Sequence, residues 1–232
     1  MRVLTTGFNF SQDGPGNRLV IHLQGCNFHC PWCSNPESMS LDGACREMTV
    51  DQVVTLALRS RAMFFSGGGV TFTGGEATLQ FDELLDCCRR LRELDINTAL
   101  ETNASHPKLP VLAQHIDHLM MDFKLADPQA HKRFTGNDGK MVRENIQKLT
   151  AMRPVSVRIP LINGINTDPL PFVAFFDTCN KENLQVELLP YHEYGRDKWT
   201  KPYTITNGFV TQEQIASFLD ALHAHGIRTT HT

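Results

Sequence analysis

Three cysteines stand close together near the N-terminus, in the segment Gly25-Cys26-Asn27-Phe28-His29-Cys30-Pro31-Trp32-Cys33. The spacing C-x3-C-x2-C brings three sulfur donors onto one short loop, where Gly25 and Pro31 disfavour regular structure. Thiolates are the usual ligands of iron–sulfur clusters and of zinc. Three thiolates leave one iron of a four-iron cluster without a protein ligand. The loop could therefore let a substrate bind metal directly.

Two other interpretations of these cysteines stay open. Zinc could be held by the three thiolates and one imidazole, from His22, His29 or a more distant histidine. Alternatively, the three side chains are reduced core cysteines. Zinc fingers usually pair two cysteine knuckles, and the sequence has no second C-x2-C pair, so the spacing favours iron. We expect the other four of the seven cysteines to be ordinary thiols, at Cys45, Cys87, Cys88 and Cys179.

The composition is that of a globular protein with one core. Of its 232 residues, 41% are hydrophobic and 20% are charged, with a net charge of −3, so we predict a single domain over residues 1–232. The charges form no long run of one sign, which argues against nucleic acid or a membrane surface as partner. The N-terminal segment does not resemble a signal peptide, and no long apolar stretch occurs, so we expect a cytoplasmic protein.

From about residue 19 onward, short β-branched or apolar runs alternate with longer segments of helical period. This order predicts an α/β fold with parallel strands and crossover helices. About six such units are visible, so we expect either a partial (β/α)6 barrel or an open doubly wound sheet. The predicted strands are Leu19–Leu23, Val70–Thr73, Ile96–Glu101, His118–Phe123, Val155–Ile159, Leu184–Leu189 and Ile227–Thr230. The predicted helices are Thr49–Arg61, Leu79–Leu94, Lys140–Met152, Leu170–Asn180 and Thr211–His225.

Local signals mark where the helices begin and end. Thr49 and Thr211 are predicted N-caps, and Gln214 completes a capping-box pattern with Thr211. Asp95 and Gly226 stand where a helix must stop before the next strand.

Polar groups repeatedly accompany the ends of the predicted strands. Because the carboxyl ends of parallel strands meet on one face of the sheet, we expect these groups to share a pocket. They are Gly74-Gly75-Glu76, Glu101-Thr102-Asn103, Asp122 and Lys124, Arg158, and Tyr191-His192.

The cysteine segment, with Trp32 as the aromatic of C-x3-C-x-aromatic-C, resembles the signature of the radical S-adenosylmethionine (SAM) superfamily. Other segments are similar to the activating enzymes of glycyl radical enzymes, among which the pyruvate formate-lyase activase type is the nearest in size. The matches span about residues 7 to 200 in the same order and imply the partial (β/α)6 barrel of that superfamily. They include Asp13-Gly14-Pro15-Gly16, Cys33–Glu37, Gly67–Thr71 leading into Gly74–Glu76, Met120–Lys124 and Leu189–Glu193.

The resemblance implies a [4Fe–4S] cluster on Cys26, Cys30 and Cys33, whose fourth iron chelates the methionine part of SAM. One electron would cleave SAM to methionine and a 5′-deoxyadenosyl radical. Under anaerobic conditions, this radical would take a Cα hydrogen from a glycine of a partner glycyl radical enzyme. The implied SAM-binding residues are Trp32, Gly74, Gly75, Glu76, Thr102, Asp122, Lys124, Arg158 and His192. The implied catalytic group is Lys124, Arg158 and Asp13, with Asp13 presented to the partner's glycine loop.

The sequence departs from that family pattern in two places. Glu101-Thr102 stands where the family has Asp-Thr, which together with Met120 and Asp122 forms a monovalent-cation site. Because Glu is one methylene longer than Asp, we treat this cation as optional. Between Ser38 and Met48 only Cys45 is available, so we expect no second cluster. The electron would then come from an external low-potential donor such as flavodoxin, and we expect the chain to act as a monomer.

Two other functions compete with the activase. One is a radical SAM enzyme that acts on a small molecule, for example a deazapurine synthase; the Asp13–Gly16 segment argues against it. The other is a non-catalytic zinc or iron–sulfur protein. The sequence does not identify the glycyl radical enzyme, the electron donor or its gene neighbours.

Overall fold

The computed structural model describes residues 1–230, which form two compact units. The first unit contains Met1–Asn27, Asn35–Thr102 and Lys108–Met120, and the second contains Phe28–Ser34, Asn103–Pro107 and the chain from Met121 onward. The chain therefore crosses from one unit to the other after residues 27, 34, 102, 107 and 120. Neither unit is a continuous stretch of sequence, and the single domain stays a prediction.

The first unit is built on a mixed sheet with the strand order β3-β1-β2-β4-β5. β2, β4 and β5 are parallel, whereas β1 runs antiparallel to both β2 and β3. β4 is buried along nearly its whole length, as expected for a parallel strand covered on both faces. The strands are β1 (Arg2–Phe10), β2 (Asn17–Leu23), β3 (Arg46–Glu47), β4 (Gly69–Gly74) and β5 (Thr98–Thr102), while β6 (His118–Asp122) crosses the boundary between the units.

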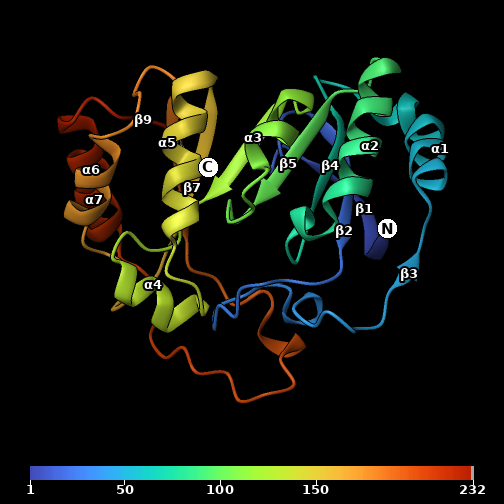
Figure 1. Ribbon diagram of the computed structural model, residues 1–232. Coiled ribbons are helices and arrows are strands. Elements are labelled where there is room, and N and C mark those ends of the chain that lie inside the picture. The colour runs from blue at the N-terminus through green and yellow to red at the C-terminus, as the bar shows by residue number, and fades with distance from the viewer. Residues whose placement is uncertain (231–232) are drawn as a thin grey trace. The chain divides into compact units, whose positions relative to one another are not determined.

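Helices α1 (Val50–Ser60) and α2 (Phe81–Glu93) lie side by side in the first unit (Figure 1). The predicted N-cap of α1 is confirmed, because Thr49 Oγ1 accepts a hydrogen bond from the backbone N of Gln52 at 3.2 Å. α2 fully buries Cys87 and Cys88, and this burial raises the pKa of Cys87 to about 12. Their predicted packing role is confirmed. The unit also contains α3 (Leu109–Leu112) and the short 3-10 helices η1 (Pro36–Ser38), η2 (Arg61–Met63), η3 (Ala77–Gln80) and η4 (Ala113–His115).

The second unit contains the parallel strands β7, β8 and β9 and the helices α4 to α7. Its core is aromatic: the ring of Phe123 lies 5.4 Å from Phe172 and 5.8 Å from Phe176, centroid to centroid, and Phe172 contacts Phe218 of α7. The elements are α4 (Pro128–Thr135), α5 (Lys140–Met152), β7 (Val155–Leu161), α6 (Leu170–Phe176), β8 (Leu184–Pro190), η5 (Arg196–Lys198), α7 (Gln212–Ala224) and β9 (Arg228–Thr230). Within residues 1–230, no helix has the length and apolar character needed to cross a bilayer.

The predicted strands and helices are found, with most of their ends shifted by a few residues. Thr211 caps α7 in a full capping box with Gln214. Asp95 and Gly226 both adopt the left-handed conformation after their helices, with φ of 51° and 69°. β7 extends to Leu161, so Arg158 lies within the strand rather than after it.

A strand, β1, and a helix, α4, were not predicted. β1 exposes most of its residues from Thr5 to Phe10, so it lacks the apolar alternation that marks a half-buried strand. α4 is too short to show a helical period, although its ends carry standard signals. Asp127 accepts a hydrogen bond from the backbone N of Ala130, Pro128 opens the helix, and Gly136 ends it in the left-handed conformation.

Candidate functional site

The cysteine loop divides between the two units, with Cys26 in the first and Cys30 and Cys33 in the second. In the first unit, Gly25 adopts a φ of +102°, which favours glycine, and its N–H donates to Ser38 O at 2.8 Å. The N–H of Cys26 donates to Met39 O at 3.2 Å. The backbone that leads into the first cysteine is therefore fixed by the segment that follows the loop.

In the second unit, Cys30 and Cys33 are joined by a turn in which the N–H of Cys33 donates to Cys30 O at 3.1 Å. The ammonium group of Lys124 interacts electrostatically with both sulfurs and forms an ion pair with Asp122 at 2.9 Å. Burial by itself lowers the pKa of Lys124, but the negative charges of Asp122, Cys30 and Cys33 outweigh it and raise the pKa. A nearby ammonium favours the thiolate form of cysteine, so Cys30 and Cys33 fit the role of thiolate ligands.

Gly74, Gly75 and Glu76 are hydrogen-bonded to the chain just before the cysteine loop. Gly75 N donates to Leu23 O at 2.9 Å, and Glu76 N donates to Gly25 O at 2.8 Å. A Cβ atom on Gly75 would lie 2.2 Å from Gly25 O, and one on Gly74 would lie 2.3 Å from the Leu23 backbone. Only glycine allows so close an approach. The two glycines therefore fix Glu76 relative to the entry of the cysteine loop.

The carboxylate of Glu76 is buried, with only 1% of the residue exposed. Its Oε1 accepts hydrogen bonds from the backbone N of Thr78 at 3.0 Å and from Thr102 Oγ1 at 2.7 Å, and also from the Thr78 hydroxyl. Glu76 is thus the N-cap of η3. The structure brings Glu76 and Thr102 together, as the prediction of a shared pocket requires within this unit.

Glu101, the residue that departs from the family pattern, accepts a hydrogen bond from Thr73 Oγ1 at 2.8 Å through its Oε2. Met120 is buried, with 5% exposure. Neither observation tests cation binding, so the monovalent-cation site stays a prediction.

Arg158 forms an ion pair that the sequence did not reveal. Its Nε donates to Glu187 Oε2 at 2.6 Å, and both side chains are only 11% exposed. Arg158 on β7 and Glu187 on β8 are direct neighbours in the strand register. The sequence does show that Arg158 and Glu187 each interrupt a largely apolar strand, which indicates a charge with a partner. It does not show which residue is that partner, because the pairing depends on the strand register.

Three aromatic or imidazole side chains of the second unit each have a defined contact. Trp32 is buried and its ring lies 5.8 Å from that of Phe134. His192 stacks on Tyr194 at 4.3 Å, and burial lowers the pKa of His192. Trp199, interpreted from sequence only as part of a surface loop, donates from Nε1 to Cys33 O at 3.1 Å. The segment after β8 therefore contacts the cysteine loop directly.

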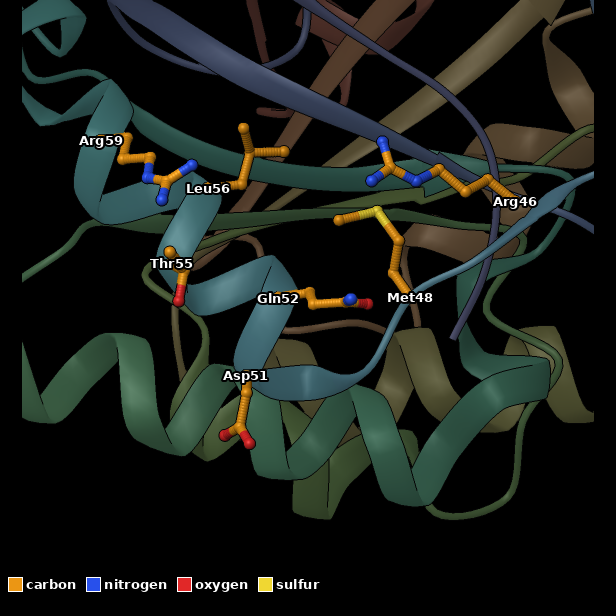
Figure 2. Close-up of a pocket in the computed structure, with 7 residues that line it drawn as sticks. All are labelled: Arg46, Met48, Asp51, Gln52, Thr55, Leu56 and Arg59. Atoms are coloured by element: carbon orange, nitrogen blue, oxygen red, sulfur yellow. The ribbon is translucent and has the colours of Figure 1, made fainter.

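Each unit also has a hollow on its surface. In the first, a cavity of about 470 Å³ runs along α1 (Figure 2) and is lined by Arg46, Met48, Asp51, Gln52, Thr55, Leu56 and Arg59. Two of its polar groups already serve the fold, since Asp51 pairs with Arg90 at 2.6 Å and Gln52 completes the α1 cap. In the second, a cavity of about 560 Å³ includes His29 and Pro31 of the cysteine loop. Among residues 1–230, no three His, Cys, Asp or Glu side chains form a ready site for a metal ion.

Comparison with known proteins identifies the family. The model of the radical SAM superfamily matches residues 20–176, which include the cysteine loop and Gly74–Glu76. The pyruvate formate-lyase-activating enzyme of Staphylococcus epidermidis is 32% identical over 210 residues, which cover 84% of this chain and 84% of that protein.

Two solved structures are similar to the chain in fold. A domain of the pyruvate-formate lyase-activating enzyme from Bacteroides vulgatus is 27% identical, with a TM-score of 0.58, and the match covers 71% of this chain and 98% of that one. A radical SAM methyltransferase from Sphaerobacter thermophilus shares the fold, with a TM-score of 0.70, 18% identity and coverage of 97% of this chain and 68% of that one. The predicted α/β class, with the partial (β/α)6 barrel of radical SAM type, is confirmed. The chain belongs to the radical SAM superfamily and, within it, to the family of proteins named pyruvate formate-lyase-activating enzymes.

Proposed function

We propose that this chain is an activase that generates a glycyl radical on a partner glycyl radical enzyme. The observation that carries the proposal is the 32% identity, over 84% of the chain, to a pyruvate formate-lyase-activating enzyme. The Asp13–Gly16 turn and the Gly74–Glu76 segment lie inside one well-packed unit, which is consistent with this function.

Cys26, Cys30 and Cys33 would hold the [4Fe–4S] cluster. When bound, the cluster would supply the electron for reductive cleavage of the sulfonium C–S bond of SAM, the chemistry needed to remove a hydrogen atom from the partner's glycine. Lys124 supports this ligand set because its ammonium group offsets the negative charge of Cys30 and Cys33. The N–H donated by Cys33 to Cys30 O keeps these two ligands in one turn.

The SAM pocket would combine groups from several strands. Glu76 would face the amino group of SAM, since a carboxylate complements an ammonium; its hydrogen bonds from Thr78 and Thr102 fix its orientation. In the second unit, the pairs Asp122–Lys124 and Arg158–Glu187 present charges whose positions are set by their partners. The family resemblance also implies that Trp32 and His192 bind SAM and that Lys124, Arg158 and Asp13 take part in catalysis.

Asp13 would face the glycine loop of the partner. Its Oδ2 accepts a hydrogen bond from Asn9 Nδ2, so its carboxylate is oriented within the turn. The turn is closed by the N–H of Ser11, which donates to Gly16 O at 3.0 Å.

The proposed function also needs a source of electrons. An external low-potential donor such as flavodoxin would deliver the electron, a monovalent cation near Glu101 is optional, and the activase would work as a monomer in the cytoplasm. A reducing compartment suits a protein whose Cys45, Cys87, Cys88 and Cys179 are all free thiols.

The test is electron paramagnetic resonance of the anaerobically reconstituted protein, mixed with SAM, a chemical reductant and, one at a time, each glycyl radical enzyme of the same organism. We expect a glycine-centred doublet on one of these enzymes, in step with the formation of deoxyadenosine. Deoxyadenosine without a doublet on any glycyl radical enzyme of the organism would favour a small-molecule substrate. A colourless preparation that contains zinc and does not bind SAM would contradict both radical functions.

A further inference from the structure

Arg18 is a charged residue buried completely within the first unit, with 0% exposure. Burial lowers the pKa of its guanidinium to about 10, although the carboxylates of Asp117 and Asp13 act in the opposite direction. Fully buried charges are rare because their loss of hydration is costly. A guanidinium in this position needs hydrogen-bond partners within the protein.

The two terminal nitrogens of the Arg18 guanidinium donate to backbone oxygens of three chain segments, one of which is the Asp13–Gly16 turn. Nη1 donates to Pro15 O at 3.0 Å and to Gly67 O at 3.4 Å, while Nη2 donates to Val70 O at 3.0 Å and to Asn97 O at 3.4 Å. One planar group therefore joins the Asp13–Gly16 turn to the glycine-rich segment before β4. Lysine, with a single ammonium, cannot reproduce this fork.

A second path reaches the same turn through Thr71. Arg18 Nε donates to Thr71 Oγ1 at 2.7 Å, and the Thr71 hydroxyl in turn donates to Asp13 O at 2.7 Å. The backbone of Asp13 is thus held by a relay whose first donor is Arg18.

Steric contacts restrict the turn on its other sides. A Cβ atom on Gly14 would lie 3.2 Å from Arg18 Cδ, and one on Gly16 would lie 2.5 Å from the backbone of residues 65–68. Both glycines also have positive φ values, 112° and 71°. The turn is therefore closely packed against Arg18 and residues 65–68, and the side chains of Arg18 and Thr71 hydrogen-bond to its backbone.

We propose that Arg18 is a positioning residue for activation of the partner: with Thr71, it holds the Asp13–Gly16 turn in the form that presents Asp13 to the partner's glycine loop. This inference rests on the proposed function. Neither side chain is assigned a contact with SAM, because their hydrogen bonds join the two side chains to each other and to the turn, and join Arg18 also to Gly67, Val70 and Asn97. Partner activation and SAM cleavage should therefore respond differently to their loss.

Thr71→Val and Arg18→Lys test the proposal in the reconstituted full-length protein. Valine has nearly the shape of threonine, so Thr71→Val removes the relay while keeping the packing. Thr98→Val is the matched control: Thr98 is equally buried, and its hydroxyl bonds to His115 O and Asp117 rather than to the turn. The readouts are deoxyadenosine formation without partner, the KM for the partner, and hydrogen exchange of the Ser11 N–H that closes the turn.

For Thr71→Val we expect a rise of about tenfold in the KM for the partner, the equivalent of one buried hydrogen bond. Deoxyadenosine formation should stay within about twofold, and Ser11 exchange should become faster. Arg18→Lys should show the same pattern more strongly, and Thr98→Val should show neither effect. A parallel loss of both activities in Thr71→Val, or equal behaviour of Thr71→Val and Thr98→Val, would overturn the proposal.

The inference and the proposed function fail in distinguishable ways. If the wild-type protein gives no glycyl radical, the proposed function and the partner role fall together, whatever Arg18 holds. If the wild-type protein activates its partner but Ser11 exchange and partner KM are unchanged in both variants, only the inference on Arg18 is wrong.

Discussion

Replacing Glu187 with leucine should destabilise the protein strongly, because it removes the carboxylate that pairs with Arg158. The two groups are 2.6 Å apart and both side chains are only 11% exposed. Removing one partner of a buried ion pair typically costs about 3–5 kcal/mol. Since some water reaches both groups, we expect the lower end, about 3 kcal/mol in the free energy of unfolding. Glu187→Gln keeps an acceptor oxygen of similar shape and should cost about 1 kcal/mol.

The double variant Arg158→Leu/Glu187→Leu separates the ion pair from the packing. Replacing both charges by apolar side chains is often neutral, so its unfolding free energy should return to within about 1 kcal/mol of the wild type. Urea unfolding followed by circular dichroism under anaerobic conditions measures all of these variants. The reasoning is refuted if Glu187→Leu costs less than about 1 kcal/mol, or if the double variant shows the sum of the two single losses.

The same cycle tests the proposed role of Arg158 in binding SAM. The double variant should regain stability without regaining SAM affinity, because the guanidinium is still missing. A KM for SAM equal to that of the wild type in this variant would place Arg158 outside the SAM pocket.

Three further predictions concern the cysteine loop and its surroundings. Cys30→Ala should abolish both iron retention and SAM cleavage, measured by iron content and deoxyadenosine yield, and persistence of either would contradict its assignment as a ligand. Trp199→Phe removes the hydrogen bond to Cys33 O and should speed the bleaching of the cluster's visible absorbance in air; an unchanged rate would show that this contact does not shield the loop. Burial lowers the pKa of His131, so the unfolded chain binds a proton there that the folded protein does not. Stability should therefore fall as the pH drops below about 6.5, by at most about 1.4 kcal/mol per pH unit. His131→Leu should flatten this fall in urea titrations, and an identical slope would assign it to other groups.

The parts of the fold that follow from local chemistry could be predicted from the sequence. Thr49 and Thr211 are N-caps because a threonine hydroxyl precedes an apolar helical period and a glutamine follows three residues later. The central strands are short runs rich in β-branched or apolar residues, such as Leu19-Val20-Ile21 in β2, and β4 is buried along nearly its whole length. β1 was missed because its exposed, polar-rich sequence has no buried face to impose a period.

The partners of the site residues depend on register and therefore could not be predicted. Nothing in the sequence around Arg158 states that Glu187 stands opposite it on the next strand. Arg18 lies just outside the predicted strand and drew no prediction, yet it is fully buried and hydrogen-bonded to backbone oxygens up to 79 residues away. The sequence motifs suffice to predict cluster ligands and glycines, because cluster chemistry restricts residue type. The groups that orient them are set by tertiary packing.

The most direct test of the central claim is electron–nuclear double resonance of the reduced, reconstituted protein with SAM labelled at its amino nitrogen and carboxylate oxygen. If Cys26, Cys30 and Cys33 leave one iron open, both labelled atoms should show hyperfine coupling to the cluster. Absence of both couplings, with the fourth iron held by a protein side chain, would contradict the account.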